Sequence, residues 1–157
     1  MTNPAFQSTL NGSLDSKGRV CIPAPFRLVL AAQNTNGVFV CPSVFDDMLE
    51  GFGQTLLDEQ HARLAAFDPL LSPEYDDIAR AFVARTMLLP ADEQGRVRLP
   101  DEMIAHAGLK DRVVFAGLST KFQIWDAERY ASIQAATIAR LRQQRERAIA
   151  KLADGTP

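Results

Sequence analysis

The sequence is poor in the residues and runs that mark several classes of protein. Its 157 residues include only two cysteines and two histidines, and no stretch approaches the roughly 18 apolar residues of a membrane helix. Cys21 and Cys41 show no CxxC spacing, which favours a reducing compartment over a disulfide framework. The first ten residues lack the basic and then apolar pattern of a signal peptide. We therefore expect a soluble, cytoplasmic protein without a membrane segment.

An excess of positive charge is also missing. Seventeen Lys and Arg stand against nineteen Asp and Glu, a formal net charge of −2. The charge is segregated, however: residues 43–77 hold nine acids and one arginine, a balance of −8, whereas residues 128–154 hold six bases and three acids, a balance of +3. Binding of a nucleic acid would therefore have to come from local patches.

Signatures of catalysis are absent as well. The sequence contains no HExxH, no GxSxG, no P-loop and no paired Cys/His spacing. His61 lies in the acidic segment and His106 near the end of an expected helix, and neither adjoins a nucleophile motif. We expect no enzyme: no catalytic residue, no metal, no cofactor and no small-molecule substrate.

The strongest positive signal is an internal repeat. The segment Asp15–Pro23 (DSKGRVCIP) recurs 77 residues later as Asp92–Pro100 (DEQGRVRLP), and six of the nine positions fit D-x-x-G-R-V-x-[IL]-P. In each copy a helix-like run follows the proline, then a glycine, then an apolar strand pattern. We expect helices over 24–32 and 101–107 and strands over 38–41 and 113–118. The chain thus contains two copies of one supersecondary unit.

The motif itself predicts a tight turn followed by a short strand. Gly18 and Gly95 can adopt positive φ at little cost, and the aspartate that opens each motif can accept hydrogen bonds from nearby backbone amides. Pro23 and Pro100 end the strand and suit the start of a helix. Each copy therefore places an arginine, Arg19 or Arg96, where a strand leaves a turn.

Between and after the repeats the pattern predicts helices. Residues 54–66 and 73–85 are expected to form two helices, with Ser72 as the N-cap of the second and Pro73 at its first position. A last helix is expected to follow Asp126 as its N-cap. Its apolar face is interrupted by Arg145, so partial packing is expected there.

A single such turn would be explained by a solvated arginine or an Asp–Arg ion pair. A duplicated turn presents two arginines at equivalent places of a pseudo-two-fold unit, and two-fold protein symmetry matches paired DNA half-sites. A β element can enter the major groove, where arginine binds guanine through two hydrogen bonds. The repeat alone is compatible both with a pair of structural turns and with a reader of double-stranded DNA.

These residues, together with Phe122–Asp126 (FQIWD) and the helical connector, resemble the MraZ family of AbrB/MazE-like transcription factors over roughly residues 6–130. The resemblance implies an α+β fold in which two tandem swapped-hairpin (SpoVT-AbrB) repeats form a double-split β-barrel, with connecting helices and a C-terminal helix. The expected divisions are 9–53 and 86–129 for the repeats, 54–85 for the acidic connector and 130–157 for the basic C-terminal helix and tail. It further implies a ring-shaped homo-oligomer, associated with the nucleoid, that binds direct repeats upstream of the division and cell-wall gene cluster.

Carried over by position, the resemblance assigns DNA contacts in both repeats. Arg19 has the leading role, Lys17 contacts phosphate or base, and Asp15 orients the turn. The second repeat offers less positive charge, because Gln94 replaces the lysine and Ile104 replaces Arg27. Residues 38–52 also lack the glycine-containing hairpin common in the family. The full DNA-binding set is Asp15, Lys17, Arg19, Arg27, Asp92, Gln94, Arg96 and Arg98, with Gly18, Gly95, Pro23 and Pro100 as structural turn residues.

Two other functions stay open at the level of sequence. AbrB-like folds also serve as antitoxins, in which an extension such as residues 127–152 would clamp a toxin. A purely structural ring protein would show no salt-dependent DNA binding. A toxin gene beside this one would favour the antitoxin, whereas a methyltransferase and division genes would favour the regulator.

Overall fold

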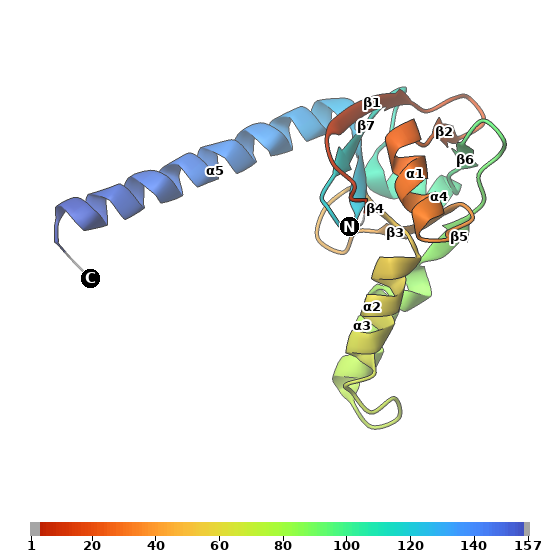
Figure 1. The fold of residues 1–157 in the computed structure, drawn as a ribbon, viewed down its shortest axis with the longest axis horizontal. Helices are drawn as coiled ribbons and strands as arrows, with labels where there is room; N and C mark the ends of the chain where they lie inside the picture. Colours follow the sequence, from red (N-terminus) through yellow and green to blue (C-terminus); the bar gives the residue numbers. More distant parts are fainter. Residues whose placement is uncertain (1–3, 156–157) are drawn as a thin grey trace. The chain divides into compact units, whose positions relative to one another are not determined.

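The computed structural model describes residues 4–155 and divides the chain into two compact units, which meet between Asp126 and Ala127. Strands dominate the first unit, and the second is a single helix (Figure 1). The elements in chain order are β1 (Thr9–Ser13), β2 (Arg19–Cys21), α1 (Ala24–Ala32), β3 (Val38–Pro42), β4 (Leu49–Phe52), α2 (Gln54–Leu64), α3 (Pro73–Ala81), the short 3-10 helix η1 (Val83–Arg85), β5 (Met87–Leu89), β6 (Arg96–Arg98), α4 (Asp101–Ala107), β7 (Arg112–Gly117), β8 (Phe122–Asp126) and α5 (Ala127–Ala153).

Six strands form one antiparallel sheet in the order β1-β7-β8-β4-β3-β5, and β2 pairs with β6 in a separate two-stranded ribbon. Exchanging the two halves of the chain, β1 for β5, β3 for β7 and β4 for β8, gives the same order backwards. The sheet is therefore pseudo-two-fold symmetric, with its centre at the β4–β8 pair. Strands of one half pair with strands of the other at β1–β7, β3–β5, β4–β8 and β2–β6.

The expected α+β class, with connecting helices and a C-terminal helix, is confirmed. The closed barrel is not: β1 and β5 are the edges of an open sheet, and the β2–β6 ribbon is separate from it. The loop between β3 and β4 lacks the glycine common in such hairpins, as the sequence indicated. β3 and β4 do form a hairpin, with a loop that contains no glycine, because the Ser43 hydroxyl accepts hydrogen bonds from the backbone amides of Phe45 (3.1 Å) and Asp46 (3.2 Å).

Helices α1 and α4 begin directly after the two motif prolines, and both have the predicted bounds. Proline suits this place because its fixed φ is helical and its missing N–H would have no partner in a first turn. Gly108 ends α4 in the left-handed conformation, with φ 59°. Each helix buries one side: Phe26, Val29 and Leu30 from α1, and Met103 and Ala107 from α4.

The core lies between the sheet, these two helices and the inner face of the ribbon. Its centre is aromatic: the ring of Phe122 lies 5.1 Å from that of Phe6 and 5.0 Å from that of Phe26, centroid to centroid. Val20 and Val97, the middle residues of β2 and β6, are also buried in this core. The ribbon is thus anchored by its inner valines, and this fixes which face it turns outward.

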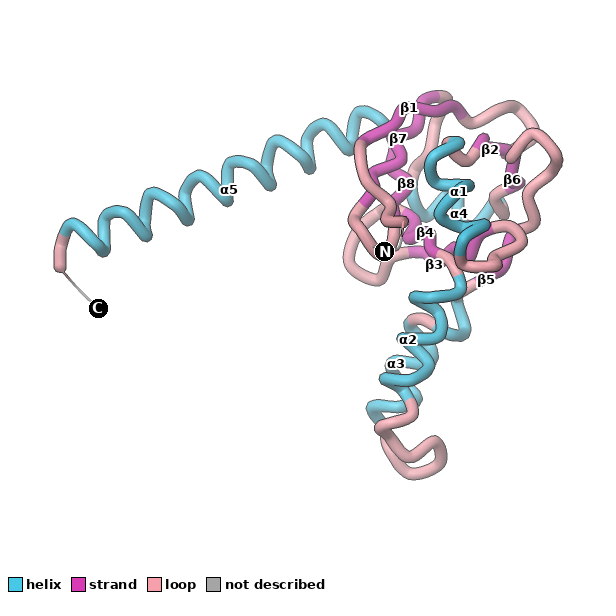
Figure 2. Tube along the Cα trace, viewed as in Figure 1, coloured by secondary structure: helices cyan, strands magenta, loops and turns pink. Residues whose placement is uncertain are grey.

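The acidic connector forms a helical hairpin, in which α2 and α3 lie side by side (Figure 2). Ser72 caps α3 as predicted, since its hydroxyl accepts from the Tyr75 amide at 3.3 Å. Both helices are shorter than expected: α2 ends at Leu64, and residues 83–85 form the separate 3-10 turn η1. Leu64 is the one buried residue among the described residues of α2 and α3.

The second unit, α5, is a 27-residue helix that begins at Ala127, as predicted. Asp126, predicted as its N-cap, is the residue directly before the helix and also the last residue of β8. Arg140, Arg147 and Lys151 recur at helical spacing on one face of the helix, and Ile138 and Leu141 lie on a different side. Among helices within residues 4–155, none has both the length and the hydropathy needed to cross a bilayer.

Candidate nucleic-acid interface

The two repeated motifs fold into the same turn. The carbonyl of Asp15 accepts from the Gly18 amide at 3.0 Å, and the Arg19 carbonyl accepts from the Asp15 amide at 2.9 Å. The corresponding bonds at Asp92, Gly95 and Arg96 are both 2.9 Å. Gly18 and Gly95 have φ of 78° and 81°, the left-handed region that the sequence required of them.

Each turn is held by its aspartate side chain. One carboxylate oxygen of Asp15 accepts from the backbone amides of Lys17 (2.9 Å) and Arg19 (2.8 Å). The other accepts from Arg19 Nε at 2.8 Å, and Asp92 repeats this with Arg96 Nε at 2.7 Å. Hydrogen bonds from the arginine backbone amide, followed by those from its side chain, hold the pKa of both aspartates below the ordinary value. Both carboxylates are therefore ionised at neutral pH.

The register of the β2–β6 ribbon brings the arginines of the two repeats together. Arg19 pairs with Arg98, Val20 with Val97, and Cys21 with Arg96. Opposed residues of an antiparallel pair share a face, and alternate residues of a strand point the same way. Since both valines face the core, the outer face carries the other four residues: Arg19, Cys21, Arg96 and Arg98.

This outer face is strongly cationic and accessible. The side chains of Arg19 and Arg96 are 29% and 40% exposed, although each is tied to its aspartate. Arg98 and Lys17 are exposed, and neither side chain makes an ion pair within the described part of the chain. Like charges directly opposite each other in a sheet are destabilising, and the ribbon nevertheless places Arg19 opposite Arg98. Such an arrangement is suited to an anionic partner.

Arg27 and Gln94, which come from different repeats, are in direct contact. Arg27 Nη1 donates to the Gln94 carbonyl at 3.0 Å, so the helix of the first repeat supports the turn of the second. A Cβ on Gly95 would lie 2.6 Å from Arg27 Cδ. At the equivalent place, Ile104 packs against Gly18, 3.3 Å from the position of a Cβ there. The structure therefore gives Arg27 a contact within the protein that the sequence did not suggest.

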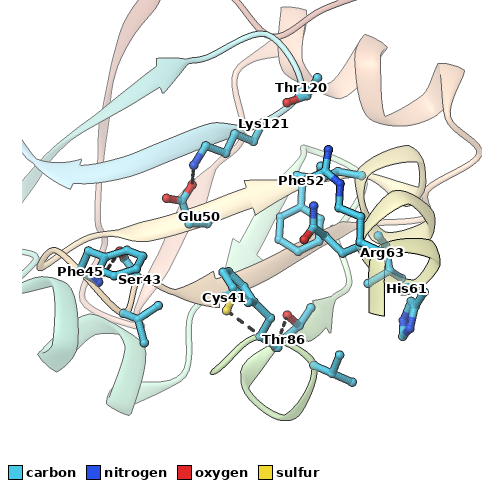
Figure 3. A pocket seen from close by; sticks show the side chains of 16 residues that line it. Cys41, Ser43, Phe45, Glu50, Phe52, His61, Arg63, Thr86, Thr120 and Lys121 are labelled. Carbon is cyan, nitrogen blue, oxygen red and sulfur yellow. Dashed lines mark hydrogen bonds and ion pairs between the residues drawn. The ribbon is translucent and has the colours of Figure 1, made fainter. Parts of the chain in front are cut away.

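The structure also contains a cavity, away from the ribbon, that the sequence did not predict. It is a mostly apolar cavity of about 320 Å³, between α2, η1 and the ends of β3 and β4 (Figure 3). Glu50 and Lys121 form an ion pair at 2.9 Å on one wall. Figure 3 shows Cys41 and His61 on different walls, one from β3 and one from α2.

The cysteine and the acidic residue of this cavity are both constrained by their surroundings. Burial raises the pKa of the Cys41 thiol, so it stays protonated and weakly nucleophilic at neutral pH. Beside the cavity, Gln123 donates to Glu50 at 3.3 Å and accepts from the Trp125 indole at 2.8 Å, so Glu50 is engaged by both Gln123 and Lys121. No group of three metal-ligating side chains occurs among residues 4–155.

Sequence reasoning assigned the arginines of the ribbon but missed Cys21 as a member of the same face. Alternation along each strand could have indicated this, because in both copies a valine separates two residues that share a face: R-V-C and R-V-R. Its meaning depends on β2 pairing with β6, two strands from opposite halves of the chain.

Comparison with known proteins identifies relatives of this chain. Residues 82–152 match the family model described as "MraZ protein, putative antitoxin-like". Proteins named "Transcriptional regulator MraZ" are similar over most of their length. The one from Xanthobacter autotrophicus is 39% identical over 90% of this chain and 89% of its own, and that from Azorhizobium caulinodans is 39% identical over 89% and 88%. The relative from Parvibaculum lavamentivorans is also 39% identical, over 82% of this chain and 80% of its own. With this identity over nine-tenths of its length and a duplicated Asp–Arg turn on one ribbon, the chain belongs to the MraZ family.

Proposed function

We propose that this protein is a transcriptional regulator that binds double-stranded DNA through the outer face of the β2–β6 ribbon. The observation that carries the proposal is the placement of Arg19 directly opposite Arg98, beside a third arginine at residue 96, on an outward face anchored by buried valines. The names of the relatives support the regulatory role. No bond-making chemistry is involved.

A two-stranded β-ribbon fits into the major groove of B-DNA. Because Arg19 Nε is bound to Asp15, its guanidinium plane is held and its two Nη groups remain for a base edge or a phosphate. The Nη2 group of Arg96 is partly engaged, since it donates to the Gln94 side chain at 3.3 Å. Arg19 is therefore the leading base contact and Lys17 a phosphate contact, with Asp15 and Asp92 as orienting residues.

One protomer offers few such contacts, which is too little for tight binding at cellular salt. We infer that the protein acts as a ring-shaped homo-oligomer on direct repeats upstream of the division and cell-wall gene cluster, its own operon included. Linked sites raise overall affinity by about 10²–10⁴ without any new contact. We also infer that the interleaved halves are the swapped-hairpin units of a split barrel, which the pairing of strands between halves supports. Such a protein would work in the cytoplasm at the nucleoid.

The test is DNA retention by Arg19→Ala, with Arg63→Ala as the matched control. Arg63 is also exposed, but it lies on α2, away from the ribbon. Fluorescence anisotropy on a duplex covering the region upstream of the gene measures both variants at several salt concentrations. Loss of one arginine–base contact is expected to weaken binding about 10- to 100-fold, with the control unchanged. Equal affinity of Arg19→Ala and wild type would refute the assignment.

An antitoxin would use the same ribbon, and the description of the matching family model includes that term. The DNA experiment does not separate the two roles, whereas the neighbouring gene does. A small toxin gene, with its product co-purifying with this protein, would favour the antitoxin.

A further inference from the structure

We infer that Arg98 is the residue that sets the direction in which each protomer binds along its DNA site. The inference rests on the proposed function and deepens it, because it concerns how the pseudo-symmetric ribbon distinguishes the two directions along a duplex. It follows from the register of the ribbon and from the residues in which the two repeats differ.

A perfectly two-fold ribbon would present the same face in both directions. The symmetry exchanges β2 with β6, so Arg19 corresponds to Arg96, and Cys21 corresponds to Arg98. The first pair is identical, even to the bond between each Nε and its aspartate. The second pair differs: a cation of the second repeat stands where the first repeat has a small neutral thiol.

The register then concentrates the charge at one end. Arg98 lies opposite Arg19, so two guanidinium groups share that end, whereas Cys21 lies opposite Arg96 and leaves a single guanidinium at the other. The turns strengthen the contrast, because Lys17 leads into Arg19 and the neutral Gln94 leads into Arg96.

Arg27 approaches the weaker end but does not restore the balance. It is half-buried, and its guanidinium donates to the Gln94 backbone carbonyl within the protein. Gln94 also accepts from Arg96 Nη2 through its side chain, so one donor of the single outer arginine is already engaged there. At the stronger end, Arg98 has no ion-pair partner in the described part of the chain and is available to DNA.

These two ends suit different base pairs. Two adjacent arginines can reach the O6 and N7 acceptors of guanines, whereas a thiol is small and weakly polar and suits an apolar group such as the thymine methyl. Turning a protomer end for end would place the arginine pair on the wrong bases. One such contact changes affinity about 10- to 100-fold, which is enough to select one direction.

The experiment is a two-by-two exchange at the pseudo-equivalent positions: wild type, Cys21→Arg, Arg98→Cys, and the double variant with both changes. Cys21→Arg makes the ribbon symmetric with two arginines at each end, and Arg98→Cys makes it symmetric with one. The double variant keeps the composition and net charge of wild type. Each full-length protein is used to enrich a random-sequence duplex library, and the repeating unit of the enriched motif is compared with its reverse complement. Thermal unfolding by circular dichroism shows that each variant folds.

Wild type and the double variant are expected to enrich asymmetric motifs. Both single variants are expected to enrich motifs of clearly greater two-fold symmetry. A role of Arg98 in overall charge alone would change affinity without producing this alternation. Equal asymmetry in all four proteins, or a palindromic motif for wild type, would overturn the inference and leave the proposed binding of DNA through the ribbon intact. Enrichment of no sequence by any folded protein would instead overturn the proposed function.

Discussion

Replacing Gly95 with alanine should cost more stability than the same change at Gly18, although the two glycines occupy equivalent turns. Their φ values are 81° and 78°, so the left-handed backbone lowers the free energy of unfolding of an alanine variant by about 1 kcal/mol at either position. At Gly18 the new Cβ would meet the flexible end of Ile104 at 3.3 Å, which can shift. At Gly95 it would lie 2.6 Å from Arg27 Cδ and force that side chain away. Arg27 would then lose its bond to the Gln94 carbonyl, about 1 kcal/mol more.

We therefore expect a loss of about 2 kcal/mol for Gly95→Ala and about 1 kcal/mol for Gly18→Ala. In an Arg27→Ala background the two losses should become equal, because the clash is gone. Urea unfolding followed by fluorescence of the buried Trp125 measures all of these, at one protein concentration and with m-values compared. Equal losses in the wild-type background, or an excess at Gly95 that persists without Arg27, would refute the structural role of Arg27.

Gly51→Ala should lower the free energy of unfolding by about 1–3 kcal/mol, because its Cβ would fall on the buried Phe122 ring; urea unfolding measures the loss. The pKa of Asp15 and of Asp92 is lowered by folding, so their stabilising effect is complete above about pH 4 and is lost as the pH falls through the lowered value. Acid unfolding curves should therefore flatten when both are changed to asparagine, whereas stability at pH 5–8 should show no pH dependence from these groups. Lys17→Gln should reduce the slope of log Kobs against log salt by about 0.9, as expected for one lost phosphate contact, and an unchanged slope would exclude that contact.

The features predicted correctly from the sequence are those with local causes. The two turns required an aspartate and a glycine at fixed spacing, and both form with matching hydrogen bonds. Helices α1 and α4 have the predicted bounds because a proline precedes each helix and an apolar face fixes its extent. Ser72 caps α3 because its hydroxyl accepts a hydrogen bond from a backbone amide three residues later, which is again a local interaction.

The features that could not be predicted depend on pairing between distant segments. β2 and β6 are three residues long and 77 residues apart, and nothing in either strand specifies its partner. The like-charge pair of Arg19 with Arg98 follows from that register alone. Arg27 was assigned to DNA because of its charge, and only the packing of α1 against the second turn places it beside Gln94. The pairing of β3 with β4 is local, but its register could not be predicted, because Ser43 stabilises a loop that lacks the usual glycine.

The interleaving of the halves also has a consequence during synthesis on the ribosome. Leu10 pairs with Phe115, so β1 has no partner until the second half of the nascent chain has been made. At about 5–20 residues per second, the 105 residues from Leu10 to Phe115 take about 5–21 s to translate. During that interval the first half exposes unpaired strands and apolar side chains that chaperones would recognise. If the two halves were expressed as separate polypeptides, each would need the other to complete its sheet, and they should fold only by complementation.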